Sequence, residues 1–310
     1  MKLQYKILWV DDQIEDYIDM GIKDEIESFI DSLGFVATID CFENGTIAEK
    51  AILNSKYDLI LSDYNIEGAN EQGDSLIQAI RDGGIYTEVL FYSAQTDFDI
   101  IAKNLYRDRV SFFSLIGDES FRGFKEKAFN LINLTVSKLQ ELNSIRGLVM
   151  SETSELDNTI EEILYSFLLK NSKESEELKK YICNSVSESV KGNVKKLDGF
   201  CEQDVYKLVK SRLFDADKKS RAINKMVRLM GLSDSQYSEF YSRYKAEVLD
   251  ARNDLAHAKS DIIDGVEYLI TTREGEIQPV KFNQEHCIGI RKNLRYHSSV
   301  LKSIREAIVG

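Results

Sequence analysis

The sequence has little proline, cysteine, tryptophan or histidine, and it has no long apolar run. Its 310 residues include one proline, four cysteines, one tryptophan and three histidines. No apolar stretch approaches the roughly 18 uninterrupted residues that a membrane span needs, so we expect no membrane segment. The first residues lead directly into a strand pattern rather than a signal peptide. These absences predict a cytoplasmic protein.

The cysteines are far apart in the chain and form no C-x-x-C pair. They stand at Cys41, Cys183, Cys201 and Cys287. Neither a zinc site nor a disulfide framework is indicated by this spacing. We therefore expect reduced, buried thiols.

Charge is distributed unevenly along the chain. Residues 1–130 hold 25 acidic and 12 basic residues, a net charge of −13, whereas residues 131–310 hold 27 acidic and 28 basic residues, a net of +1. Within the second part, residues 191–228 carry 11 basic and 5 acidic residues, and residues 291–305 carry five basic residues and no acidic one. These stretches are either contacts for a polyanion or ordinary solvated helix faces.

The first part of the chain alternates short apolar runs with amphipathic stretches. The apolar runs are typical of buried parallel strands, and they span residues 5–10, 35–41, 58–63, 88–93 and 110–115. Helix-like segments lie between them, at residues 14–33, 45–54, 74–81 and 98–106. The alternation predicts an α/β doubly wound five-stranded parallel sheet with the strand order two, one, three, four, five.

The second part of the chain has mainly helical spacing from Glu119 onward. We expect a domain at residues 1–135 and an all-α helical domain at residues 136–310. Further helices are predicted at residues 155–169, 174–190, 202–213, 218–229, 235–258 and 285–308. Residues 266–272 and 276–282 predict a small β-hairpin, whose second strand should be an edge strand because it contains Pro279.

Acidic and hydroxyl side chains stand where three of the predicted strands end. Asp11 and Asp12 follow the first strand, Asp63 ends the third, and Ser93 ends the fourth. In the predicted strand order these three ends are neighbours. Carboxylates from adjacent strands supply the oxygen ligands that Mg²⁺ prefers, and Mg²⁺ in turn binds phosphate oxygens well. The pattern predicts a cation and phosphate site at this edge of the sheet.

Here the sequence resembles the receiver domains of two-component response regulators, over about residues 4–130. The resemblance rests on the strand-end residues above and on the segment that follows Asp63, which reads Tyr64-Asn65-Ile66-Glu67-Gly68 with Gly73, Leu76 and Ile80-Arg81 further on. It implies that Asp11, Asp12, Asp63 and the backbone carbonyl of Asn65 hold Mg²⁺. It further implies that Asp63 accepts a phosphoryl group, from a histidine kinase or another phosphodonor, and that Ser93 is the switch hydroxyl.

The sequence departs from that family at the end of the fifth strand. Receivers usually carry a lysine there, but this strand ends Phe112-Phe113-Ser114-Leu115-Ile116, and the nearest lysines are Lys103 and Lys125. Phosphorylation should therefore be slow, atypical or replaced by another input. Phe112 and Phe113 either rearrange together with Ser93 or are simply core residues.

A second motif lies near the end of a predicted helix in the second part of the chain. It reads Arg252-Asn253-Asp254-Leu255-Ala256-His257. Asn253 and His257 are four residues apart and share a helix face, and the long stem of Arg252 can reach the same side. An imidazole that titrates near neutral pH can move a proton, while a guanidinium stabilises charge on a phosphate. The alternative is that His257 is structural.

This motif resembles the arginine, four to six residues and histidine of HEPN-superfamily nucleases. The resemblance covers about residues 145–310, and it implies a homodimer with Arg252, Asn253 and His257 at a composite site. Cleavage of RNA there would use the substrate's own 2′-hydroxyl and need no metal cofactor. Neither His286 nor His297 has a ligand partner at convincing spacing, and we expect both on surfaces or helix faces.

Two functions from different classes remain open on the sequence. One is an endoribonuclease gated by phosphorylation or by a partner, with RNA as substrate. The other is a non-catalytic response-regulator signalling or scaffold protein, whose helical domain only dimerises or binds a partner. A DNA-binding regulator is disfavoured, because no short DNA-binding module is recognisable and the second part carries a net charge of only +1.

Overall fold

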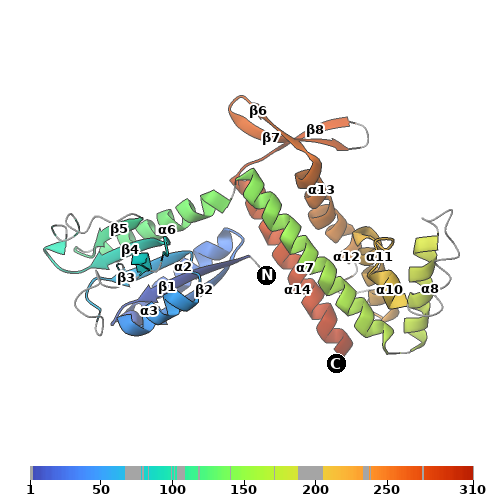
Figure 1. Cartoon of the computed structure of the whole chain (residues 1–310), viewed down its shortest axis with the longest axis horizontal. Helices are drawn as coiled ribbons and strands as arrows, with labels where there is room; N and C mark the ends of the chain where they lie inside the picture. The colour runs from blue at the N-terminus through green and yellow to red at the C-terminus, as the bar shows by residue number, and fades with distance from the viewer. Residues whose placement is uncertain are drawn as a thin grey trace. The chain divides into compact units, whose positions relative to one another are not determined.

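A computed structural model of the chain describes residues 3–66, 78, 80–82, 84–98, 100, 102, 109–117, 119–139, 141–170, 172–187, 205–232, 237, 239–273 and 276–309. The chain divides into two compact units, Leu3–Ser144 and Ile145–Gly310. We call them the sheet unit and the helical unit. Each unit is described by itself below (Figure 1).

The sheet unit contains five parallel strands in the order β2-β1-β3-β4-β5, as predicted. The strands are β1 (Gln4–Val10), β2 (Val36–Phe42), β3 (Leu59–Asp63), β4 (Glu88–Ser93) and β5 (Val110–Ser114). The helices bounded within the described residues are α1 (Ile14–Asp19), α2 (Ile22–Ser32), α3 (Gly45–Asn54) and α6 (Ser120–Leu139). This receiver-like α/β fold follows from the alternation of buried strands with amphipathic helices.

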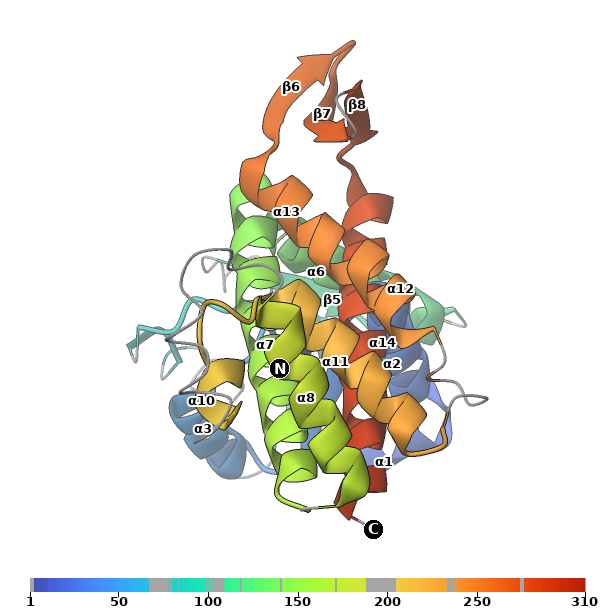
Figure 2. The same cartoon turned by 90° about the vertical axis from the view of Figure 1, so that its right-hand side faces the viewer.

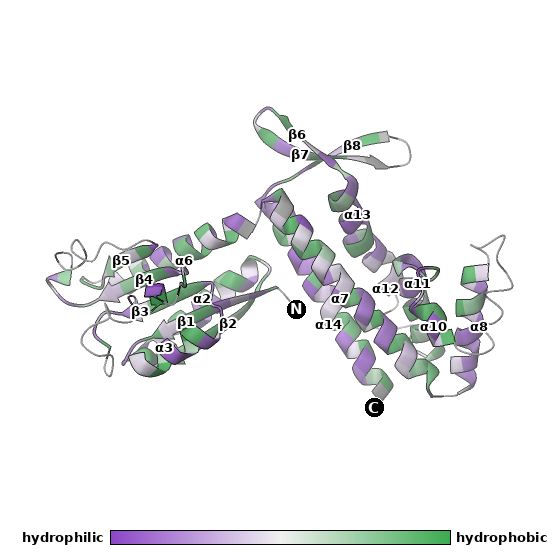
Figure 3. Cartoon of the chain, viewed as in Figure 1, coloured by the Kyte–Doolittle hydropathy of each residue, from purple (hydrophilic) through white to green (hydrophobic). Residues whose placement is uncertain are grey.

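Side chains of successive strand residues point to opposite faces of the sheet, and both faces are covered. Leu8 and Val10 of β1 join a buried cluster with Ala48 of α3. Trp9, between them, lies against Phe124 of α6, with ring centroids 5.8 Å apart. Because both faces are covered, the strands read as continuous apolar runs in the sequence. Figure 3 shows green segments in these strands and green and purple faces on the helices around them.

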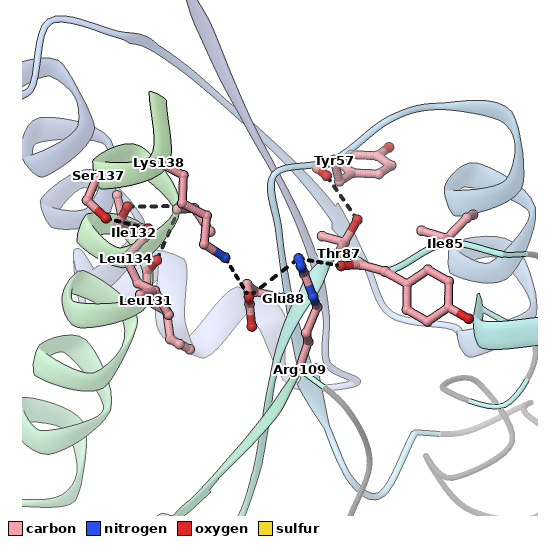
Figure 4. Close-up of polar contacts among 12 residues, drawn as sticks. Tyr57, Ile85, Thr87, Glu88, Arg109, Leu131, Ile132, Leu134, Ser137 and Lys138 are labelled. Atoms are coloured by element: carbon pink, nitrogen blue, oxygen red, sulfur yellow. Dashed lines mark hydrogen bonds and ion pairs between the residues drawn. The ribbon is translucent and has the colours of Figure 1, made fainter. Parts of the chain in front are cut away.

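A buried carboxylate ties α6 to the amino-terminal end of β4. Glu88 is 9% exposed, and its Oε1 accepts a hydrogen bond of 3.4 Å from Lys138 Nζ of α6. Arg109 Nη1 lies 3.7 Å from the same oxygen and donates to the carbonyl of Tyr86 (Figure 4). Two cations thus compensate a carboxylate that is largely removed from water. The phosphoacceptor candidates lie at the opposite end of the strands.

The helical unit is built from helices that range from 5 to 27 residues in length. They are α7 (Leu142–Leu168), α8 (Lys173–Ser187), α10 (Val205–Val209), α11 (Ala216–Leu229), α12 (Phe240–Tyr244), a π-helical turn η1 (Lys245–Leu249), α13 (Asp250–His257) and α14 (Gln284–Val309). Arg305 of α14 and Glu162 of α7 form an ion pair of 3.2 Å, which places these two helices side by side. None of the helices in the described ranges combines the length and the apolarity of a membrane span.

A small antiparallel sheet, ordered β6-β7-β8, projects from one end of the helical unit (Figure 2). Its strands are β6 (Lys259–Ile263), β7 (Val266–Arg273) and β8 (Glu276–Lys281). Pro279 lies in the edge strand β8, as predicted. The predicted hairpin is confirmed as β7 and β8, and a third strand, β6, was not predicted. All residues of β6 are exposed, so the sequence lacked the apolar alternation that marks a half-buried strand.

Several local expectations are corrected by the structure. The helix expected over residues 14–33 is two helices, because Gly21 adopts a left-handed φ of 73° between α1 and α2. His297 is 1% exposed, so it is a core residue rather than a surface one. Cys183 is disulfide-bonded, whereas Cys41 and Cys287 are free. A pairing between distant cysteines leaves no short motif in the sequence, and Cys201 lies outside the described residues.

Candidate phosphoacceptor site and the helical motif

The carboxyl ends of β1 and β3 bring three carboxylates together. In the register of the sheet, Val10 of β1 lies beside Ser62 of β3. Asp11 and Asp12 follow β1 directly, and Asp63 ends β3. Each of the three contributes one carboxylate oxygen to a group whose atoms all lie within 4.8 Å of one another. The sequence predicted this meeting from the strand order.

The electrostatics of these carboxylates suit a divalent cation. Burial raises the pKa of Asp63 to about 6, and the nearby charge of Asp11 adds to the rise, while the N–H groups of Tyr64 and Asn65 oppose it. Burial also raises the pKa of Asp11. Three anions so close repel one another, and a bound cation would favour their charged forms. Oxygen donors of this kind fit Mg²⁺.

Ser93 and Asn65 lie together beside the carboxylates. Asn65 Nδ2 lies 3.4 Å from Ser93 Oγ, at the long end of hydrogen-bond distance. Gln95 supports both residues, since its backbone N–H donates to Ser93 Oγ at 3.2 Å and its Nε2 donates to Asn65 Oδ1 at 2.9 Å. Gln95 was not predicted from the sequence. The segment with Glu67, Gly68, Gly73 and Leu76 lies outside the described residues.

The end of β5 carries a hydroxyl side chain at the place where receiver domains usually have a lysine. Ser114 pairs with Ser93 in the parallel register of β4 and β5. Its Oγ is buried, without a hydrogen-bond partner in the described ranges. Lys125 does not substitute, because its ammonium pairs with Glu25 of α2 at 2.6 Å. Lys103 lies outside the described residues.

A hydrogen-bond chain that was not predicted reaches Asp11 from the other face of the sheet. Tyr92 of β4 donates its phenolic proton to Asp11 Oδ2, with 2.5 Å between the oxygens. Trp9 of β1 donates its indole N–H to the same phenol at 2.7 Å. In the sequence, only its position immediately before Ser93 could have pointed to Tyr92 as a residue near the site.

In the helical unit the RNDLAH motif lies on α13, where its polar side chains are spread around the helix. His257 and Asn253 are exposed and line a cavity of 290 Å³ with Asp254 and Thr271. Arg252 is half-buried, and its Nη2 lies 3.3 Å from Asn253 Oδ1. Among the described residues, no hydrogen bond or ion pair joins Arg252 to His257.

An arginine of α7 fixes the end of the motif helix. Arg146 Nε donates to the carbonyl of Leu255 at 2.8 Å, and its Nη2 donates to the carbonyl of Ala258 at 2.8 Å. Carbonyls in the last turn of a helix lack partners within the helix, and a cation there also complements the helix dipole. The backbone that carries His257 is thereby held on the body of the helical unit.

Several basic side chains of the first stretch are paired within the unit. Four of the five basic residues of α11 pair with acidic partners, as Lys218–Asp215, Lys219–Glu161, Arg221–Asp217 and Lys225–Glu177. In the second stretch Arg291 is fully buried. These basic residues are paired or buried within the unit, which favours ordinary helix faces over a polyanion-binding surface at these positions.

Comparison with solved structures finds receiver domains that are similar to part of this chain. A signal receiver domain of an HD domain-containing protein from Pseudomonas fluorescens Pf-5 is 17% identical, with a TM-score of 0.32, over 43% of this chain and 98% of that one. A receiver domain of a Francisella response regulator is 21% identical, with a TM-score of 0.31, over 44% of this chain and 98% of that one.

A response regulator receiver domain from Clostridium thermocellum is 14% identical, with a TM-score of 0.33, over 43% of this chain and 95% of that one. No protein-family model matches the sequence, and no curated protein matches it. At these identities the likeness concerns fold alone. The roles of individual residues therefore rest on the strand ends described above.

Proposed function

We propose that the chain is a response regulator whose sheet unit accepts a phosphoryl group on Asp63 in the presence of Mg²⁺. The observation that carries this proposal is the group of carboxylates from Asp11, Asp12 and Asp63, which meets Ser93 at adjacent strand ends. The resemblance of the sequence to receiver domains points the same way. A histidine kinase or a small phosphodonor is the expected input.

The residues of the site divide the chemistry between them. A carboxylate oxygen of Asp63 attacks the phosphorus of the donor, the bond from phosphorus to the leaving group breaks, and Asp63 carries an acyl phosphate. The hydroxyl of Ser93 donates to a phosphoryl oxygen. Mg²⁺ held by Asp11, Asp12, Asp63 and the carbonyl of Asn65 would supply the positive charge that offsets repulsion between the carboxylate and the phosphate.

Phosphodonor labelling tests this function directly. Acetyl phosphate with Mg²⁺ should add one phosphoryl group to the wild type and none to Asp63→Ala, as read by intact mass. The reaction should be slow, since no lysine is supplied at the end of β5. Asp58→Ala is a matched control, because Asp58 lies at the opposite end of the same strand and bonds the N–H of Lys6. Equal labelling of the wild type and Asp63→Ala would show that Asp63 is not the residue that accepts the phosphoryl group.

For the helical unit we propose a metal-independent endoribonuclease of HEPN type as the regulated output. Support comes from the exposed imidazole of His257, which lines a cavity beside Asn253 at the end of a fixed helix. The resemblance to HEPN nucleases implies a composite site made by two copies of the motif, so the proposal includes a homodimer. The substrate would be RNA, and DNA lacks the attacking 2′-hydroxyl.

A non-catalytic output is the second candidate, and one observation favours it. Burial raises the pKa of Asp157 on α7, and the positive charges of Lys219 and then of Arg252 oppose that rise, so Arg252 acts electrostatically on a carboxylate of its own unit. In this alternative Arg252 and His257 are structural, and the helical unit dimerises or binds a protein partner. Cleavage of RNA in EDTA by the wild type and by His257→Ala separates the two outputs.

A further inference from the structure

The hydrogen bonds that join Trp9, Tyr92 and Asp11 have a fixed direction. An indole N–H can only donate and an ionised carboxylate can only accept, so the phenol of Tyr92 accepts from Trp9 and donates to Asp11. Trp9 and Tyr92 are fully buried, and Asp11 is 2% exposed. Water therefore does not compete for these groups, and bonds that involve a charged group in such surroundings are strong.

Asp11 is held through both of its carboxylate oxygens. Oδ2 accepts from Tyr92, and Oδ1 accepts from the backbone N–H of Gln13 at 2.8 Å. The side chain therefore stays in one orientation although Asp12 and Asp63 place further negative charge within 4.8 Å. The hydroxyl of Tyr17 is a further partner of Asp11, and without the Tyr92 donor this weaker support would be left to oppose rotation of the carboxylate away from its negative neighbours.

Aromatic rings hold the phenol of Tyr92 in place. The ring of Phe124 on α6 meets Tyr92 edge to face, with centroids 4.7 Å apart. The ring centroid of Tyr17 on α1 lies 5.2 Å from that of Trp9 and 6.0 Å from that of Tyr92. Packing of this kind fixes side-chain orientation in addition to burying apolar area.

We propose that Tyr92 is a positioning residue for the metal ligand Asp11, and that Trp9, at the far end of the same hydrogen-bond chain, reports whether the cation site is occupied. The inference rests on the proposed function, because it assumes that Asp11 helps to hold Mg²⁺. Hydrogen-bond partners that orient metal ligands are commonly worth about 10- to 100-fold in metal affinity. Tyr92 should act on affinity in this way without touching the cation.

The first test measures Mg²⁺ affinity of the full chain by titration calorimetry. Tyr92→Phe should weaken binding by about 10- to 100-fold. Tyr5→Phe is the matched control: Tyr5 is also buried in the sheet, and its hydroxyl bonds Thr135 rather than a site residue. Tyr5→Phe should bind Mg²⁺ as the wild type does. Circular dichroism establishes that each variant is folded.

The second test uses the fact that Trp9 is the one tryptophan of the chain. Added Mg²⁺ should change the tryptophan emission of the wild type, with the same midpoint as the calorimetric titration. Asp11→Asn and Tyr92→Phe should lose this change, since the first removes a charged ligand of the cation and the second breaks the hydrogen-bond chain that joins Trp9 to the site. The wild-type titration needs no variant, so it decides the reporting role of Trp9 even if Tyr92→Phe is poorly folded.

The outcomes separate this inference from the function on which it rests. If the wild type binds Mg²⁺ and Tyr92→Phe binds it equally well, Tyr92 does not position Asp11 although the cation site stands. Binding seen by calorimetry without any change in tryptophan emission would overturn the reporting role of Trp9. If the wild type binds no Mg²⁺, the proposed cation site and this inference fail together.

Discussion

Asp63 carries a negative charge that its surroundings disfavour when no cation is bound. Burial raises its pKa from 3.8 to about 6, and the charge of Asp11 contributes to the rise. The folded state therefore holds this proton more tightly than the unfolded chain does. It follows that the free energy of unfolding falls as the pH rises from 3.8 through about 6, and that the loss is complete above this window.

Replacing Asp63 by asparagine should remove that loss. We expect Asp63→Asn to raise the free energy of unfolding by about 1–3 kcal/mol near pH 8, and to change it little near pH 4. The lower end of this range allows for the partial exposure of the side chain. Urea unfolding in EDTA, followed by Trp9 emission, gives the measurement. Asp19→Asn, at an exposed position of α1, should show no such pH dependence. A destabilisation near pH 8 would contradict the expectation.

The sequence could place the carboxylates but not the residues that orient them. Asp11, Asp12 and Asp63 were predicted to meet because parallel strands end at one edge of a sheet, and this depends only on strand order. Tyr92 was missed because alternation places its side chain on the face opposite to that of Ser93. Its hydroxyl reaches Asp11 only through the length of the tyrosine side chain, which no sequence pattern records.

Helix α6 packs on β5 at a position where a glycine is required. A methyl group on Gly123 would lie 2.8 Å from Cζ of Phe113, which is closer than carbon atoms approach. The Phe113 ring in turn lies against Phe124, with centroids 6.4 Å apart, so its movement would disturb the aromatic residues around Tyr92. The closeness of α6 to the sheet therefore depends on this glycine.

Gly123→Ala should consequently destabilise the sheet unit, although alanine is the better helix former. The helix gains roughly 1 kcal/mol from the exchange, whereas overpacking costs about 1–3 kcal/mol, so we expect a net loss on the order of 1 kcal/mol. Urea unfolding followed by Trp9 emission measures it. In a Phe113→Leu background the contact is relieved, and the same Gly123→Ala change should be neutral or stabilising. Equal losses in both backgrounds would show that the contact is not the cause.

At the scale of elements, buried strands and long amphipathic helices were predictable, and exceptions have local causes. The five parallel strands were predicted in number and order, because each is an apolar run that neighbours cover on both faces. β6 was missed since all its residues are exposed. The helix predicted at residues 235–258 includes the π-helical turn η1, which helical periodicity does not distinguish from the α-helix on either side.

The two units differ in charge, and this difference bears on the output of the whole molecule. Residues 1–130 carry a net charge of −13 and residues 131–310 a net of +1. RNA is a polyanion, so the acidic sheet unit should disfavour its approach at low salt. Basal activity of the full chain on RNA is therefore expected to be low, and a chain reduced to the helical unit should be more active.

As a homodimer, the chain should act as a ribonuclease. We expect the full chain to cleave RNA in EDTA and to leave 2′,3′-cyclic phosphate ends, because His257 moves the proton and Arg252 stabilises charge on the phosphate. His257→Ala should lower the rate by about 10²- to 10⁴-fold, and Arg252→Ala should be similarly damaging. His286→Ala is the matched control, since it removes an imidazole from the same unit, at a cavity that does not include His257.

Gel analysis of total RNA and end-group assays supply the rate and the product, and sedimentation velocity supplies the oligomeric state. The same assays are applied to a chain of residues 145–310, which lacks the acidic unit and keeps the motif intact. If that chain is a folded dimer yet matches its own His257→Ala variant on every RNA in EDTA, the ribonuclease proposal fails. Arg252 would then be a structural cation engaged with Asp157 of α7, and the helical unit would transmit the state of Asp63 by dimerisation or by binding a protein partner.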